Sequence, residues 1–327
     1  MIMKDPFGFN LDLNSFCFLC GDELFESNKS KEHVFPKWML REFKLQGKKL
    51  ILQNETTIPY EKLTIPCCKK CNNESLSSME ETIRKGVLGG YDEFIKIADE
   101  LIISWVTKLY MGVLIKESKL SFDRSNQKDR YIVDQEILDK KNINFLILRS
   151  IYHKTQTSDN LVSLFKYNVS KQDDFILDFD YKSPQYMYYA NPSYNTVFLK
   201  MNNIGLILFL QDAGLMKDIY FDFEANKKTS ERSISYFEFI ETFVRLYYKY
   251  TLTDYNPKYI TIGSRSNFGA DKIYIANNFK NGFPAIFSKW DSKEFYACLL
   301  FYCRKLGFES FSPSNPNNFT FIKELSE

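Results

Sequence analysis

Two short cysteine-containing stretches decide the fold expected for the first part of the chain: CFLCG at residues 17–21 and CCKKCNN at residues 67–73. Each stretch contains two cysteines separated by two residues. Two pairs with this spacing are typical of a closed tetrahedral zinc site in which every thiolate is a ligand. The pattern therefore predicts a structural Zn²⁺ ion held by Cys17, Cys20, Cys68 and Cys71.

The run EHVFP at residues 32–36 lies between the two cysteine pairs and contains His33, the only histidine of that segment. An imidazole titrates close to neutral pH and is therefore suited to act as a general base. Here it also follows a carboxylate, Glu32. We predict that His33 activates an attacking water. The alternative is a histidine that packs beneath the zinc site.

Residues 17–85 resemble HNH (ββα-metal) endonucleases of the four-cysteine type. The resemblance rests on three features in order: Cys-x-x-Cys, an acid-His-hydrophobic-x-Pro run, and Cys-x-x-Cys-Asn. It implies a zinc-stabilised ββα-metal module that hydrolyses DNA phosphodiester bonds, with His33 as the general base. It also implies that Glu32 and Asn72 bind the catalytic cation. Both offer oxygen ligands, which suit Mg²⁺ or Mn²⁺ better than zinc.

One feature of the HNH pattern is missing. The family usually carries a middle asparagine shortly before the second cysteine pair, where it orients the base histidine, and this chain has Lys62, Leu63 and Thr64 there. The sequence leaves open which other group orients His33. Asn72 has an alternative role as a helix cap. The resulting second hypothesis is a catalytically silent zinc module that binds nucleic acid or docks a partner protein.

The composition is that of a globular protein: 327 residues, 44% hydrophobic and 26% charged, with a net charge of +2. Residues 28–85 carry 12 Lys/Arg against 7 Asp/Glu. This local excess favours a polyanionic partner, DNA or alternatively RNA. A solvated lysine-rich loop explains it equally well.

Five of the seven cysteines lie in the first 71 residues, and Cys67 has no partner at two-residue spacing, so we treat it as a spare thiol. Clustered cysteines of this kind indicate metal binding and not disulfides, which are rare in the cytoplasm. We also find no signal peptide at the start and no uncharged apolar run long enough to span a membrane. We expect a cytoplasmic protein without a membrane partner.

The fold class expected is α+β: a zinc-stabilised module at residues 1–90, followed by a larger α+β domain with an antiparallel sheet at residues 91–327. One long helix is predicted over residues 92–120, and helices over 233–250 and 291–306. Strands are predicted at residues 30–35, 63–66, 144–149, 161–167, 187–190, 197–201, 204–210, 219–223 and 258–262.

The second domain contains no phosphate loop, nucleophile elbow or dinucleotide turn. We therefore expect residues 91–327 to select substrate, sense a signal or bind a partner, which includes a second copy of this chain. The other histidine, His153, has no companion acid and is interpreted as a surface or structural residue. By analogy with stand-alone HNH proteins, a role in restriction or anti-phage defence is the expected biology.

Overall fold

The computed structural model describes residues 15–123, 125–126, 130–153, 155–157, 161–170, 174–176, 179–181, 183–220, 232–262, 272–275 and 287–308. Helices and antiparallel sheets are combined in it, which confirms the α+β class. The chain forms two compact units. Unit 1 takes the described residues of 1–85, 97–159 and 259–274, and unit 2 takes those of 86–96, 160–258 and 275–327.

Both units use residues from either side of position 90. The compact units and the linear division expected at that position are therefore different groupings. The division of roles between residues 1–90 and 91–327 stays a prediction.

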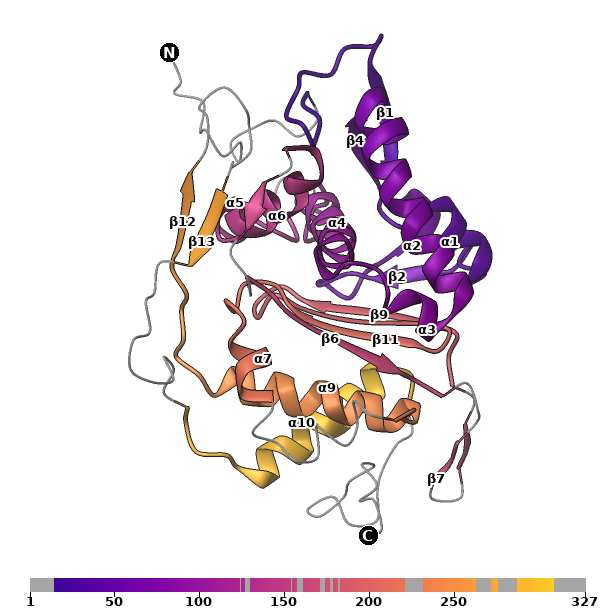
Figure 1. The fold of residues 1–327 in the computed structure, drawn as a ribbon, viewed down its shortest axis with the longest axis vertical. Helices are drawn as coiled ribbons and strands as arrows, with labels where there is room; N and C mark the ends of the chain where they lie inside the picture. The colour runs from indigo at the N-terminus through magenta and orange to yellow at the C-terminus, as the bar shows by residue number, and fades with distance from the viewer. Residues whose placement is uncertain are drawn as a thin grey trace. The chain divides into compact units, whose positions relative to one another are not determined.

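The zinc-site segment of unit 1 is built on two paired strands and a helix (Figure 1). β1 (Lys29–His33) and β4 (Thr64–Cys68) run antiparallel, with Lys29 opposite Cys68 and His33 opposite Thr64. A π-helical turn, η2 (Cys71–Leu76), then leads into α2 (Ser77–Gly89). The strands predicted at residues 30–35 and 63–66 are confirmed as β1 and β4. No side chain caps the start of η2, which contradicts the alternative role of Asn72 as a helix cap.

Unit 1 contains further elements, some between β1 and β4 and the others after α2 in the chain. They are α1 (Lys37–Glu42), β2 (Lys49–Ile51), β3 (Thr57–Pro59), the 3₁₀ turn η1 (Tyr60–Lys62), α4 (Asp99–Glu117), α5 (Gln135–Asp139), α6 (Asn142–His153), β5 (Gln156–Thr157), β12 (Tyr259–Ile262) and β13 (Lys272–Ile275). α4 packs against α6 and β4, and α6 also contacts η2. Much of the core of unit 1 therefore lies along α4.

Two predictions about this region are wrong. The single helix expected over 92–120 is two helices, α3 (Tyr91–Phe94) and α4, because the backbone is extended at Ala98 (ψ 135°). Asp99 and Glu100 then occupy the first turn of α4, where the helix dipole favours acidic side chains. The strand expected at 144–149 is part of α6. Its consecutive apolar residues are buried, and such a short run does not distinguish a buried strand from a buried helix.

Unit 2 is organised around a four-stranded antiparallel sheet in the order β6 (Ser163–Asn168), β11 (Ile204–Phe209), β10 (Thr196–Met201) and β9 (Tyr186–Asn191). Helices α7 (Leu215–Tyr220), α9 (Tyr236–Thr251) and α10 (Ser292–Lys305) lie on one face of it (Figure 1). Phe198 of β10 stacks on Phe239 of α9 with ring centroids 4.5 Å apart. A short hairpin, β7 (Asp174–Ile176) and β8 (Phe179–Tyr181), completes the described elements.

The sequence predicted most of unit 2 correctly. The strands predicted at 197–201 and 204–210 are joined by a turn at Asn202-Asn203, and Asn202 has the positive φ (51°) that asparagine tolerates. The strand expected at 219–223 is wrong where it is described, because Ile219 and Tyr220 end α7. The remaining residues of that strand lie outside the described residues.

Among the described residues, no helix is both long enough and apolar enough to cross a membrane. The cytoplasmic location stays a prediction.

Candidate metal centre and acid–histidine cleft

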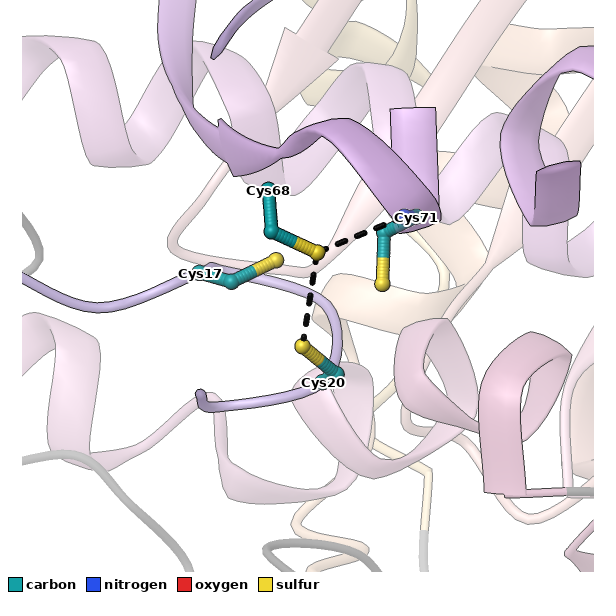
Figure 2. A group of neighbouring side chains, drawn as sticks. All are labelled: Cys17, Cys20, Cys68 and Cys71. Atoms are coloured by element: carbon teal, nitrogen blue, oxygen red, sulfur yellow. Dashed lines mark hydrogen bonds between the residues drawn. The ribbon is translucent and has the colours of Figure 1, made fainter. Parts of the chain in front are cut away.

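Four cysteine side chains converge in unit 1 and form the candidate metal centre. Cys17 and Cys20 lie in a loop that the Phe16–Glu23 bridge closes, Cys68 ends β4, and Cys71 begins η2 (Figure 2). Their sulfur atoms all lie within 4.8 Å of one another, and all four residues are buried. These are the four cysteines predicted from the sequence.

The geometry fits a tetrahedral zinc ion. A Zn–S distance of about 2.3 Å places tetrahedral sulfur atoms about 3.8 Å apart. The Sγ atoms of Cys20 and Cys68 are 3.8 Å apart (Figure 2). Backbone amides also donate to the sulfur atoms: Cys71 N to Cys68 Sγ at 3.3 Å and Asp22 N to Cys20 Sγ at 3.5 Å. The four thiols could therefore hold a structural metal ion such as zinc.

Local backbone geometry explains how the first pair forms. Gly21 has φ 79°, a left-handed conformation that glycine adopts at no steric cost. Its N–H donates to Cys17 O at 2.9 Å and closes the turn. This turn at Gly21 closes the loop that carries Cys17 and Cys20.

Cys67 is buried beside the cluster but does not belong to it. Its Sγ lies 3.8 Å from Cys17 Sγ. Cys67 and Cys68 are neighbours in β4, and successive side chains of a strand point to opposite faces. The group of four that lies within mutual reach includes Cys68, as the spacing predicted.

The ionisation of these thiols is mutually dependent. Hydrogen bonds from Cys20, Cys67 and Cys71 lower the pKa of Cys17. Conversely, hydrogen bonding to Cys17 is the largest cause that raises the pKa of Cys20, Cys67 and Cys71. The thiolate of Cys17 is thus stabilised, whereas ionisation of Cys20, Cys67 and Cys71 is disfavoured. A bound cation changes this balance, because metal ligation deprotonates every coordinating thiol.

A second site lies at the end of β1, where a cleft of about 470 Å³ opens. Glu32, His33 and Asn72 all line it, although Asn72 is 39 residues further along the chain than His33. Antiparallel pairing places Cys68, at the end of β4, opposite Lys29, at the start of β1. η2 follows within three residues, so the Asn72 side chain contacts Ser30 and Lys31 of β1. The structure therefore brings together the three residues to which the resemblance assigns catalysis.

Asn72 is tied to β1 through its side-chain amide. Its Nδ2 donates to Ser30 Oγ at 3.1 Å and to Lys31 O at 3.4 Å. The amide is thus fixed in orientation, and its Oδ1 is the atom that could bind a cation. Its role as a ligand stays a prediction.

Glu32 is buried and forms an ion pair that the sequence did not indicate. Lys108 of α4 places its Nζ 2.6 Å from Glu32 Oε1 and 2.9 Å from Glu80 Oε1. Burial lowers the pKa of Lys108, but the two carboxylates outweigh this and raise it above its ordinary value. Burial is also the main cause that raises the pKa of Glu80.

His33 is half-buried at the mouth of the cleft. Burial lowers its pKa, and the positive charges of Lys37 and Lys108 lower it further, against the opposing effect of Glu32. A lowered pKa keeps the imidazole neutral at pH 7, the form in which it can accept a proton.

Basic and acidic side chains both line the cleft, the acidic ones being Glu32, Glu80 and Glu81. Lys31, Lys37 and Arg41 line it and are exposed, and none of them forms an ion pair with another described residue. Arg84 also lines the cleft but is paired with Glu81 at 3.2 Å. The three unpaired cations give the cleft an electrostatic preference for anions.

Within the described residues, the four cysteines are the only cluster of three or more cysteine, histidine or acidic ligand atoms close enough to hold a metal ion. The cleft instead offers Glu32 and the amide oxygen of Asn72. Mg²⁺ keeps several waters and commonly binds one or two carboxylates together with substrate phosphates, so cation binding by Glu32 and Asn72 stays a prediction.

Sequence reasoning missed Lys108 and Glu80. A signal for Lys108 was present: it is the only charged residue in the stretch WVTKLYMGVLI (105–115) of a long helix. A lysine within such a run is buried only when it is paired. No pattern links Glu80 to Glu32, because their contact depends on how α2 packs.

Comparisons of this chain with protein-family models, with curated proteins and with solved structures found no match.

Proposed function

We propose that this protein is a metal-dependent HNH-type endonuclease that hydrolyses DNA phosphodiester bonds in the cleft at the end of β1. One observation carries the proposal: the neighbours Glu32 and His33 line a single cleft together with Asn72, which lies 39 residues further along the chain, and with three unpaired cations. The resemblance of residues 17–85 to HNH endonucleases supports it. The zinc site would be purely structural and would hold the loop, β4 and η2 in place.

The residues of the cleft divide the chemistry among them. His33, neutral at pH 7, accepts the proton of the attacking water. Lys31, Lys37 and Arg41 hold the phosphate backbone of the substrate. Glu32 and Asn72 would hold a Mg²⁺ or Mn²⁺ ion, which supplies stabilisation of the charge that develops on the phosphate.

The test is nicking of supercoiled plasmid by the full chain with Mg²⁺ or Mn²⁺, and zinc content is measured on the same samples. We expect the wild type to cut and His33→Ala to lose at least about 100-fold in rate, since general-base catalysis contributes 10²–10⁴-fold. Both proteins should hold about one zinc ion. A zinc-loaded wild type that cuts neither DNA nor RNA with either metal contradicts the proposal.

A second candidate is a catalytically silent module that binds nucleic acid. The ion pair between Glu32 and Lys108 favours it, because one oxygen of the proposed ligand is already engaged. This candidate predicts DNA binding that Lys37→Ala and Arg41→Ala weaken and that His33→Ala leaves unchanged. Each removed phosphate contact should also reduce the salt dependence of binding by about one unit of slope.

We also propose, from the resemblance, that the nuclease acts in restriction or anti-phage defence. Cells that express the wild type should then resist phage infection, measured by efficiency of plating, and cells that express His33→Ala should not. Equal plating on both strains would contradict this role and leave the nuclease activity to the plasmid assay.

A further inference from the structure

A buried lysine lies directly beneath the proposed catalytic residues. Lys108 is at the centre of α4, and its side chain has no exposed surface. Its Nζ contacts four oxygen atoms: Glu32 Oε1 at 2.6 Å, Glu80 Oε1 at 2.9 Å, His33 O at 2.6 Å and Val34 O at 3.0 Å. An ammonium group has three N–H donors, so its bonding capacity is fully used.

Two of these contacts set the position of the imidazole. The carbonyls of His33 and Val34 belong to the last residue of β1 and the one after it, where strand pairing with β4 ends. The Val34 N–H also donates to Leu63 O at 2.8 Å, which continues the pairing one residue beyond β1. The ammonium adds two bonds to carbonyls at the strand end that carries His33.

The other two contacts set the position of the acid. Lys108 binds Oε1 of Glu32 at 2.6 Å and so holds this carboxylate beside the histidine. Glu80 of α2 places its Oε1 2.9 Å from the same ammonium, so two acids share one lysine. Lys108 contacts all four oxygen atoms although it lies 75 residues after His33 in the chain.

Lys108 is not among the residues that line the cleft, so it does not touch substrate. We propose that Lys108 is the positioning residue of this site, which holds the Glu32 carboxylate and the His33 backbone in their working arrangement from beneath the cleft. This inference rests on the proposed endonuclease function. It assigns to α4 the task of orienting the base histidine.

The chain offers a matched control for a purely structural lysine. Lys200 of unit 2 is buried to the same degree, and its Nζ donates to Pro184 O and Asn202 O, both at 2.6 Å. Its substitution removes a buried ammonium from a place with no role in the cleft. A loss that arises from lower stability alone should therefore appear in both variants.

The experiment compares Lys108→Met, Lys108→Arg and Lys200→Met in the full zinc-loaded chain. For Lys108→Met we expect kcat for nicking to fall about 100-fold, the effect of a displacement of about 1 Å. KM for DNA should stay within about two-fold, since Lys31, Lys37 and Arg41 are intact. Lys108→Arg keeps the charge and should recover at least about 10-fold of the loss. Lys200→Met should keep the wild-type kcat.

Lys108→Met also leaves two facing carboxylates without their cation, which can prevent folding. In that event the variant Lys108→Met/Glu80→Gln restores the charge balance and replaces it in the assay. Wild-type kcat in the Lys108 variants, or an equal loss in Lys200→Met, would overturn the proposal.

A second readout does not depend on cleavage. The chain has two histidines, so the NMR signals of the His33 ring are assigned by comparison with His33→Ala. We expect Mn²⁺ to broaden the His33 signals in the wild type at a concentration that leaves them sharp in Lys108→Met. If the wild type fails to cut but this difference appears, the endonuclease proposal fails and the positioning role stands. Equal broadening in both proteins, or broadening in neither, overturns the positioning role.

Discussion

His33 shows how one side chain depends on its surroundings for its chemistry. Burial lowers its pKa, and Lys37 and Lys108 add to this effect. The protonated ring is therefore less stable in the folded chain than in the unfolded chain, whose histidine pKa is about 6.5. The contribution of His33 to folding stability is therefore fully present above about pH 6.5, and it is lost as the pH falls through the lowered pKa of His33.

We predict that the acid limb of the nicking rate has its midpoint below about pH 6.5. The reason is that only the neutral imidazole accepts a proton from water. The measurement is the single-turnover nicking rate between pH 5 and pH 8, with His153→Ala as the control that should retain the same midpoint. A midpoint clearly above 6.5 would show that His33 is not the base or that its pKa is not lowered.

The neighbouring cysteines of β4 provide a matched pair of variants. We predict that Cys68→Ser loses its zinc on dialysis against a chelator, because Cys68 is one of the four mutually close thiols. Cys67→Ser should keep about one zinc ion per chain. Metal content by mass spectrometry checks both. The reverse result would show that Cys67, whose Sγ lies 3.8 Å from Cys17 Sγ, is the true ligand.

Among the elements, α4 packs closely on the end of β1, and Gly112 of α4 determines how close this approach can be. A Cβ atom at Gly112 would lie 2.8 Å from Cγ1 and 2.9 Å from Cγ2 of Val34, the residue after His33. These distances are too short for carbon atoms in contact. Glycine at this position therefore allows α4 to bring Lys108 within reach of β1.

We predict that Gly112→Ala destabilises the protein by about 1–3 kcal/mol, the usual cost of overpacking a core. The higher helix propensity of alanine, worth about 1 kcal/mol, offsets only part of this. Urea unfolding measures the change. The double variant Val34→Ala/Gly112→Ala should lose less than the sum of the two single losses, because the clash is removed. A single Gly112→Ala variant more stable than the wild type would contradict the packing.

At the scale of the whole molecule, the two units have separate sources of stability. Unit 1 contains the cysteine cluster, whereas unit 2 has a four-stranded sheet covered by α9 and α10. α9 also begins with a capping box between Ser235 and Glu238. Metal binding is coupled to folding in small metal sites, and stability differs between parts of a structure.

We predict that zinc removal affects unit 1 far more than unit 2. After chelation, hydrogen exchange should accelerate in β1, β4 and α2, while β10, β11 and α9 keep their protection. Zinc added back should restore the slow exchange in unit 1. Equal acceleration in both units would show that they unfold together.

Features that depend on local spacing could be predicted from the amino-acid sequence alone. Four cysteines in two pairs predicted the cluster that could hold a metal ion, because two Cys-x-x-Cys turns supply the four ligands of a tetrahedron. Strand periodicity and turn residues predicted the sheet of unit 2, since they act over a few residues. The EHVFP run and Asn72 predicted which residues would meet in a cleft.

The groups that contact these residues depend on tertiary packing. Lys108 meets Glu32 and the His33 carbonyl because α4 packs against β4, and such packing depends on the shapes of many side chains and not on a motif. The same reason explains why residues 144–149 form a helix: an apolar run is compatible with strand and helix, and its neighbours α4 and η2 select between them. Local sequence patterns thus identified the candidate site residues, whereas long-range packing placed Lys108 beside Glu32 and His33.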